Sequence, residues 1–87
     1  MILVSQDKEE IVNFDKVESI WICSDEEGRF TIEATAHTND TLGTYDTEER
    51  AKEVLQEIVS KYKTTLYNSK TNETVVNVPK VYEMPKE

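Results

Sequence analysis

Residues 47–62, TEERAKEVLQEIVSKY, decide the fold class of this chain. Apolar side chains recur there every three or four positions, which predicts an amphipathic helix with one apolar stripe. The stripe consists of Ala51, Val54, Leu55, Ile58, Val59 and Tyr62. Asp46 or Thr47 can cap the start, and Asp46 has capping-box spacing to Glu49. A helix that is apolar on one side has to pack against a second layer of structure.

The segments before the helix supply that layer as strands. Arg29–Thr38 alternates with period two, so Phe30, Ile32, Ala34 and Ala36 are expected to face the core, and His37 to face outward. Val17–Ser24 is apolar on both faces, which predicts a central strand. The tetrapeptide Asp25-Glu-Glu-Gly28 between them is typical of a hairpin turn.

Shorter extended segments flank this pair. Further strands are expected at Met1–Ser5, Ile11–Phe14 and Thr41–Tyr45, and Gly43 indicates a bulge or a close backbone approach. After the helix, the sequence favours a short strand at Thr64–Tyr67, a turn at Asn68–Asn72, and extended segments at Thr74–Val78 and Lys80–Met84 around Pro79. The prediction is one α+β domain over residues 1–87. An antiparallel β-meander packs against one helix, and an extended C-terminal segment returns to the sheet.

The charge is strongly acidic and unevenly distributed. The net charge is −8, from 18 acids and 10 bases. Residues 1–57 hold 15 acids and 5 bases, whereas residues 58–87 hold 3 acids and 5 bases. A nucleic-acid binder needs a basic stripe to replace phosphate counterions, so direct nucleic-acid binding is not expected. An acidic surface can instead meet a basic protein surface, or can serve solubility alone.

Catalytic, metal and cofactor sites are not expected. Cys23 is the single cysteine and His37 the single histidine, and no spacing links either to a nucleophile–base pair. Cys23, followed by three acids, is expected to be a buried structural thiol. Gly28 and Gly43 are the only glycines, so no glycine-rich phosphate loop exists. No apolar run suggests a signal peptide or a membrane span, so a cytoplasmic protein is expected.

The residues expected to bind a partner are carboxylates and one tryptophan. The tryptophan, Trp21, is either an exposed anchor of an interface or a residue packed beneath the C-terminal segment. The carboxylates expected to contact a basic partner are Glu9, Glu10, Asp25, Glu26, Glu27, Glu48, Glu49 and Glu53. The alternative is that these carboxylates only form a solvated surface and bind no partner.

Several segments resemble a family of small uncharacterised proteins from phages and prophages of Gram-positive bacteria. The similar segments are Ile11–Asp15, Val17–Ile20, Leu42–Tyr45, Thr47–Ile58 and Tyr82–Pro85, about half of the chain. The family has no assigned activity, so the resemblance implies a context and no site. That context is accessory phage genes, among which small acidic inhibitors of host defence are common.

These observations predict a non-enzymatic binding protein that inhibits a host defence component, anti-CRISPR-like or otherwise, by covering a basic surface. One alternative is a sponge that sequesters a small nucleotide signal through Arg29, Arg50, Lys52 and tyrosines, which the acidic charge disfavours. Another alternative is a structural or accessory module that forms homo-oligomers through a sheet edge.

Overall fold

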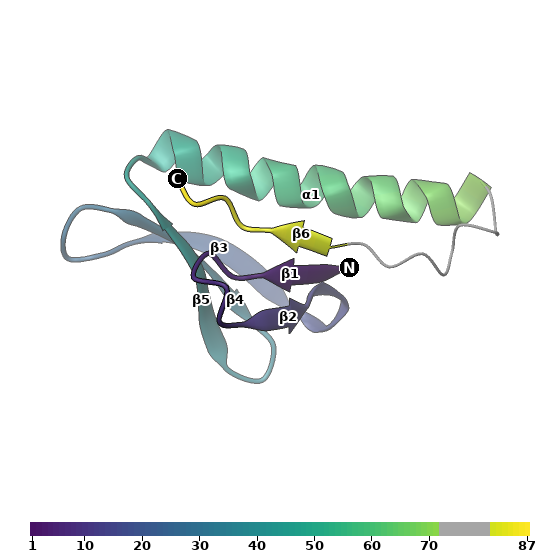
Figure 1. Cartoon of the computed structure of the whole chain (residues 1–87), viewed down its shortest axis with the longest axis horizontal. Coiled ribbons are helices and arrows are strands. Elements are labelled where there is room, and N and C mark those ends of the chain that lie inside the picture. The colour runs from purple at the N-terminus through teal and green to yellow at the C-terminus, as the bar shows by residue number, and fades with distance from the viewer. Residues whose placement is uncertain (72–80) are drawn as a thin grey trace.

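The computed structural model describes residues 1–71 and 81–87, and of residues 63–71 the backbone only. It confirms an α+β fold in which two three-stranded sheets pack with one helix (Figure 1). The elements in chain order are β1 (Ile2–Val4), β2 (Ile11–Asn13), β3 (Ser19–Ser24), β4 (Phe30–Thr35), β5 (Asn39–Tyr45), α1 (Glu48–Thr71) and β6 (Val81–Glu83). A single 3₁₀ turn, Phe14–Lys16, lies between β2 and β3.

The meander sheet consists of β3, β4 and β5 in sequence order, all antiparallel. Gly28 has φ 81° in the β3–β4 hairpin, a left-handed conformation in which a side chain is strained. The pairing of β4 with β5 shifts register between Ile32 and Glu33. Gly43 pairs with Ile32 beside this bulge, and the ring of Tyr45 lies against it. Of the two alternatives predicted for Gly43, the bulge is present, and the close approach is that of the Tyr45 side chain and not of another backbone segment.

The position of β3 corrects one prediction. β3 is an edge strand and pairs only with β4 among the described strands. Ile20 and Ile22 contact the core, whereas Trp21 is half-buried and is not among the residues packed against the core. The apolar residues on both faces of Val17–Ser24 therefore mark an edge strand covered on one face, not a central strand.

The second, N-terminal sheet has the strand order β2-β1-β6. β1 and β2 form an antiparallel hairpin, and β6 runs parallel to β1 with Leu3 opposite Tyr82. The C-terminal segment thus returns to a sheet, but to this separate sheet instead of the meander. In the turn between β1 and β2, Lys8 has φ 66°, where a glycine or asparagine would be less strained.

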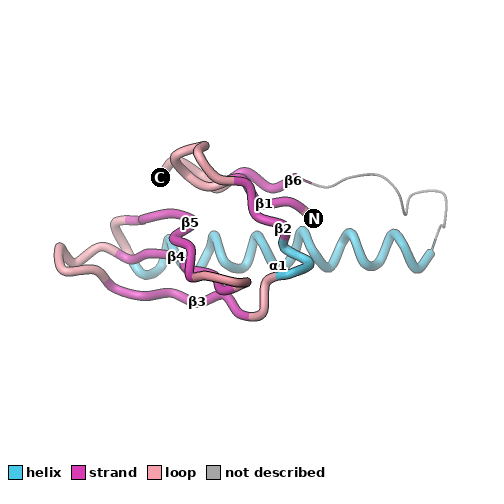
Figure 2. The backbone as a smooth tube through the Cα atoms, turned by 90° about the horizontal axis from the view of Figure 1, so that it is seen from below, coloured by secondary structure: helices cyan, strands magenta, loops and turns pink. Residues whose placement is uncertain are grey.

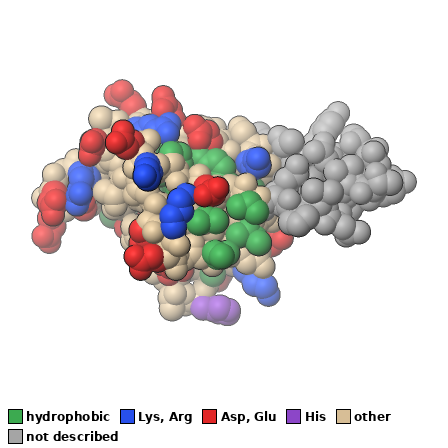
Figure 3. Space-filling view, viewed as in Figure 1, with side chains coloured by type: hydrophobic (Ala, Val, Ile, Leu, Met, Phe, Trp, Pro, Cys, Tyr) green, Lys and Arg blue, Asp and Glu red, His purple; other side chains and the backbone are tan. Residues whose placement is uncertain are grey.

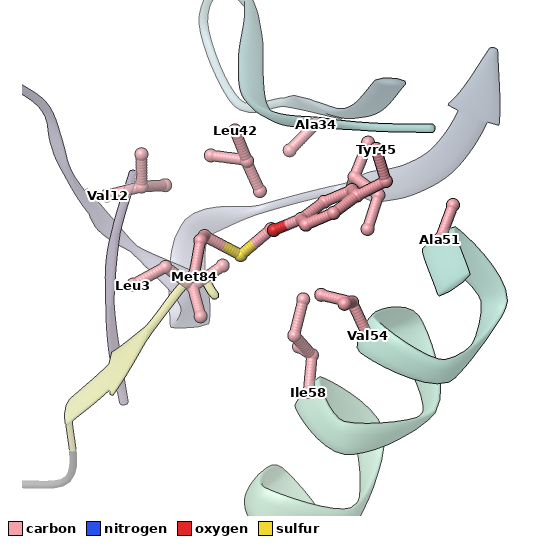
Figure 4. Packing of buried hydrophobic residues seen from close by; sticks show 10 residues of the cluster. Leu3, Val12, Ala34, Leu42, Tyr45, Ala51, Val54, Ile58 and Met84 are labelled. Atoms are coloured by element: carbon pink, nitrogen blue, oxygen red, sulfur yellow. The ribbon is translucent and has the colours of Figure 1, made fainter. Parts of the chain in front are cut away.

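The core lies between the two sheets and the helix. Figure 2, seen from below, shows the strands of the two sheets beside one another along α1. Figure 4 shows Tyr45 and Met84 between the strands and α1, which contributes Ala51, Val54 and Ile58. All five side chains are at most 2% exposed. The helix stripe is narrower than predicted, because Val59 is 38% exposed.

The ends of α1 differ from the predicted ends. Thr47 caps the helix, since its Oγ1 accepts a 3.1 Å hydrogen bond from the main-chain N–H of Arg50. The pairing of Asp46 with Glu49 in a capping box is not the arrangement found. The helix continues to Thr71, so the strand at Thr64–Tyr67 and the turn after it are wrong. No glycine or proline interrupts this stretch. The segment Thr74–Val78 and Pro79 lie outside the described residues.

Gln6 ties the two sheets together. Its main-chain N–H donates to the Leu42 oxygen at 2.8 Å, and its side-chain oxygen accepts from Thr44 N at 2.7 Å. Its Nε2 lies 3.0 Å from the Thr44 oxygen and 3.1 and 2.7 Å from the oxygens of Pro85 and Lys86. The hydrogen bonds of Gln6 with Leu42 and Thr44 thus take the place of strand pairing along β5. Its side-chain amide also binds the segment after β6.

Candidate functional site

Sheet register brings two acidic segments to one end of the molecule. Phe30 at the start of β4 pairs with Tyr45 at the end of β5. The hairpin before Phe30 and the helix start after Tyr45 therefore leave the meander sheet at the same end. We call this surface the acidic end; its carboxylates are Asp25, Glu26, Glu27, Asp46, Glu48, Glu49 and Glu53. Figure 3 shows acidic side chains gathered there.

The hairpin half of the acidic end is held by its own hydrogen bonds. Asp25 Oδ1 accepts from the main-chain N–H groups of Glu27 and Arg29, each at 2.9 Å. The Arg29 guanidinium contacts Asp25 Oδ2 at 3.3 Å and Glu27 Oε2 at 3.0 Å. The hydrogen bond from the Arg29 N–H, with smaller contributions from Glu27 N–H and the Arg29 charge, lowers the pKa of Asp25. The hairpin thus presents ionised carboxylates on an ordered turn.

The helix half is organised around Arg50. Its Nη1 lies 3.1 Å from Glu53 Oε1 and 3.6 Å from Glu57 Oε2. Its Nε donates to the main-chain oxygen of Glu87 at 2.9 Å. Lys52 lies 3.9 Å from Glu48. The Arg50 charge is thus already matched by neighbouring acceptors.

Three carboxylates of the acidic end remain free for an outside partner. Glu26, Asp46 and Glu49 are exposed and form no ion pair within the described part of the chain. No ion pair among the described residues therefore neutralises their negative charge. The sequence interpretation treated Asp46 as a possible helix cap and did not include it among the partner-binding carboxylates, although its position next to the Thr47 cap was a signal for that role.

A shallow pocket of about 330 Å³ lies at the start of α1. Its lining includes Tyr45, Thr47, Arg50 and Lys86. The Tyr45 hydroxyl donates to the Pro85 oxygen at 2.9 Å, and burial raises the pKa of Tyr45 to about 12. The Tyr45 hydroxyl, the Thr47 hydroxyl and the Arg50 guanidinium in this pocket therefore all have partners within the chain.

Glu9 and Glu10 lie elsewhere, in the turn between β1 and β2. Desolvation and the nearby charges of Asp40 and Asp7 raise the pKa of Glu10. Asp40 stands near the beginning of β5 and Tyr45 at its end, a separation of about 17 Å for five strand residues. The structure therefore separates Glu9 and Glu10 from the acidic end and places them in a second acidic group.

Trp21 lies apart from both acidic groups, on the outer face of the meander sheet. It pairs with Glu33 of β4, whereas Tyr82 of β6 lies in the other sheet and packs against the core. Trp21 does not pack beneath the described part of the C-terminal segment. Its half-buried indole is therefore accessible from the open side of β3.

Cys23 and His37 do not come together. Cys23 is exposed, which corrects the expected buried thiol; it lies at an outward position of the edge strand. His37 lies in the β4–β5 turn instead of on a strand face. Cys23 pairs with Thr31 at one end of β4, whereas His37 follows Thr35 at the other, so neither assists the other.

Within the described ranges, no three His, Cys, Asp or Glu side chains are grouped so that they could hold a metal ion. No helix among these residues is long and apolar enough to cross a bilayer. No protein-family model, curated protein or solved structure matches this chain. The resemblance to phage proteins stays a prediction.

Proposed function

We propose that this protein is a non-enzymatic binding protein whose acidic end covers a basic surface of another protein. The observation that carries this is the meeting of hairpin and helix start at one end of the meander sheet. Seven carboxylates gather there. Of the bases beside them, Arg29, Arg50 and Lys52 are each engaged by acids of the same chain, and Lys86 lines the pocket at the start of α1. A concentrated negative field of this kind steers and orients a basic partner.

The acidic end is held in a fixed conformation by its own hydrogen bonds, which supports a role in binding. The Asp25 side chain closes the hairpin with two main-chain hydrogen bonds, and the Thr47 hydroxyl fixes the first turn of α1. A preformed surface loses less conformational entropy when a partner binds. The acidic end is therefore suited to binding without refolding.

A nucleotide sponge receives less support from the geometry. Arg29 and Arg50, which it would need for phosphates, already contact Asp25, Glu27, Glu53 and Glu57. A phosphate near them would also meet the free carboxylates of the acidic end. A phosphate would have to displace these ion pairs, whereas a basic protein surface can bind the free carboxylates and leave the ion pairs in place.

The resemblance to phage and prophage proteins supplies the class of partner. It favours a cytoplasmic host defence protein whose basic groove accepts nucleic acid, because an acidic protein can compete for that groove. Binding of this kind would inhibit the defence protein.

A capture experiment tests the proposal. Tagged wild-type protein is incubated with lysate of a Gram-positive host at low and high salt. A partner is expected at low salt and lost at high salt, since exposed charges are screened. The variant Glu26→Lys/Glu49→Lys should capture none, because it reverses two exposed carboxylates that have no ion pair among the described residues.

The matched control is Glu9→Lys/Asp40→Lys, which makes the same charge change in the second acidic group. It is expected to capture the partner as the wild type does. Loss of capture in this control alone would move the binding surface to the β1–β2 turn. Equal capture by all three proteins would rule out an electrostatic surface at the acidic end.

A further inference from the structure

The open edge of β3 lacks the features that usually protect an edge strand. β3 reads Ser-Ile-Trp-Ile-Cys-Ser over residues 19–24 and has neither charge nor proline. No described strand pairs with its outer side, and the bulge of this sheet lies between β4 and β5. Natural proteins commonly block such edges with lysine, proline or a bulge. An unprotected six-residue edge is therefore suited to pairing with another strand.

The main-chain groups that face this edge belong to Ile20, Ile22 and Ser24. Asp25 N donates to the Arg29 oxygen at 2.9 Å, so these two residues form a hydrogen-bonded pair at the hairpin. Antiparallel pairs alternate between hydrogen-bonded and non-hydrogen-bonded positions. The alternation directs the main-chain groups of Trp21 toward β4 and those of Ile20 and Ile22 toward the open side.

We infer that β3 pairs in antiparallel orientation with β3 of a second copy, about a two-fold axis through Trp21. The strand is almost palindromic about this residue, with isoleucine on either side and Ser19 matched by the similarly sized Cys23. In this register, Ile20 forms a hydrogen-bonded pair with Ile22 of the second copy. Trp21 meets its own equivalent at a non-hydrogen-bonded position, where side chains lie closest.

The two faces of the joined sheet also match. A two-fold axis perpendicular to the sheet keeps both outer faces on the same side, so the two Trp21 rings meet on the outer face. Ile20 and Ile22, half-buried beside the core, meet their counterparts on the inner face. The result is a six-stranded sheet with a helix on the inner side of each half.

The composition of the paired residues favours a second copy as the occupant. In this register tryptophan meets tryptophan, isoleucine meets isoleucine, and Ser19 meets Cys23, so a second β3 is the matching strand. Residues 19–23 carry no charge, so the paired residues themselves bring no like charges together.

Sedimentation equilibrium of the whole chain tests the dimer, and the single tryptophan gives a second signal. The wild type is expected to be a dimer at high micromolar concentration, with Trp21 emission shifting to longer wavelength on dilution. Trp21→Lys should raise the dimer Kd by roughly 100-fold, because it replaces an aromatic pair by like charges. Thr41→Lys, an exposed change on β5, should leave the Kd unchanged.

Disulfide trapping tests the register. In a Cys23→Ser background, Trp21→Cys should give a covalent dimer on mild oxidation, because the two-fold axis brings these positions together. Thr41→Cys in the same background should stay monomeric. A monomeric wild type, a Trp21→Lys variant that still dimerises, or trapping at Thr41 without trapping at Trp21 would each overturn this pairing. These outcomes are independent of partner binding at the acidic end.

Discussion

The hydroxyl of Tyr82 on β6 donates a 2.6 Å hydrogen bond to Glu57 Oε1 on α1. This bond joins the C-terminal strand to the helix across 25 residues of chain. Partial burial, together with the Glu57 carboxylate, raises the pKa of Tyr82 above its usual value of 10.0. Burial acts in the same direction on Tyr45.

Stability is therefore expected to fall at alkaline pH. Above about pH 10 the unfolded chain loses its phenol protons while folded Tyr45 and Tyr82 keep theirs, so unfolding releases protons. The free energy of unfolding should be flat near pH 9 and should decrease toward pH 12. Urea unfolding across this range measures it, and Tyr82→Phe should reduce the slope. At neutral pH this variant should lose about 1 kcal/mol. A flat profile to about pH 12 would contradict the raised pKa values.

A methyl group at Gly43 should be poorly tolerated. A Cβ there would lie 2.9 Å from the Tyr45 hydroxyl and 3.1 Å from ring atom Cε2. The ring is 2% exposed and its hydroxyl is held by Pro85, so it cannot move away without losing contacts. Gly43→Ala is expected to lower the free energy of unfolding by about 2 kcal/mol in urea titrations.

A double-mutant cycle tests whether the Tyr45 hydroxyl causes the loss of stability in Gly43→Ala. In a Tyr45→Phe background the closest contact is absent, so Gly43→Ala should cost less than it does in the wild type. Equal costs in both backgrounds would show that the Tyr45 hydroxyl is not the obstacle.

The Gln6 amide should resist replacement by a carboxylate. Gln6→Glu keeps the acceptor for Thr44 N but places a negative charge beside the oxygens of Pro85 and Lys86. We expect a loss of about 2 kcal/mol at neutral pH. The pKa of this new carboxyl should be raised, so its penalty should shrink as the pH falls below about 5. Gln6→Ala should show no such recovery relative to the wild type.

The helix cap gives a direct comparison between neighbouring residues. Thr47→Ala removes the acceptor for Arg50 N and should lower stability by about 1 kcal/mol. Asp46→Ala should cost clearly less, because Asp46 contributes only its charge near the helix start. Thermal unfolding of the two variants measures both losses of stability and shows which residue caps the helix. A larger loss for Asp46→Ala would contradict the cap.

Much of the fold could be predicted because its signals are local. The stripe of Ala51, Val54 and Ile58 and the alternation of Phe30, Ile32 and Ala34 each report burial directly. The N-terminal sheet was not predictable, since β1, β2 and β6 have three residues each and β6 finds its partner about eighty residues away. Short strands of this kind depend on tertiary contacts.

The candidate site could be predicted only in its residue types. Glu26 and Glu49 lie on segments far apart in the chain, and only the pairing of Phe30 with Tyr45 brings these segments to one end. Glu10 is also a carboxylate, yet its position beside Asp40 places it in a different group. The edge position of β3 was missed because an edge strand with one core-facing side and a half-buried Trp21 on the other resembles, in sequence, a strand buried on both faces.

The most direct measurement is the salt dependence of affinity for the captured partner, followed by calorimetric titration. The wild type should bind at least about tenfold more weakly when salt is raised from low to physiological concentration. The Glu26→Lys/Glu49→Lys variant should bind weakly at both concentrations, while Glu9→Lys/Asp40→Lys should match the wild type. An affinity independent of salt, or unchanged by reversal of Glu26 and Glu49, would contradict binding through the acidic end.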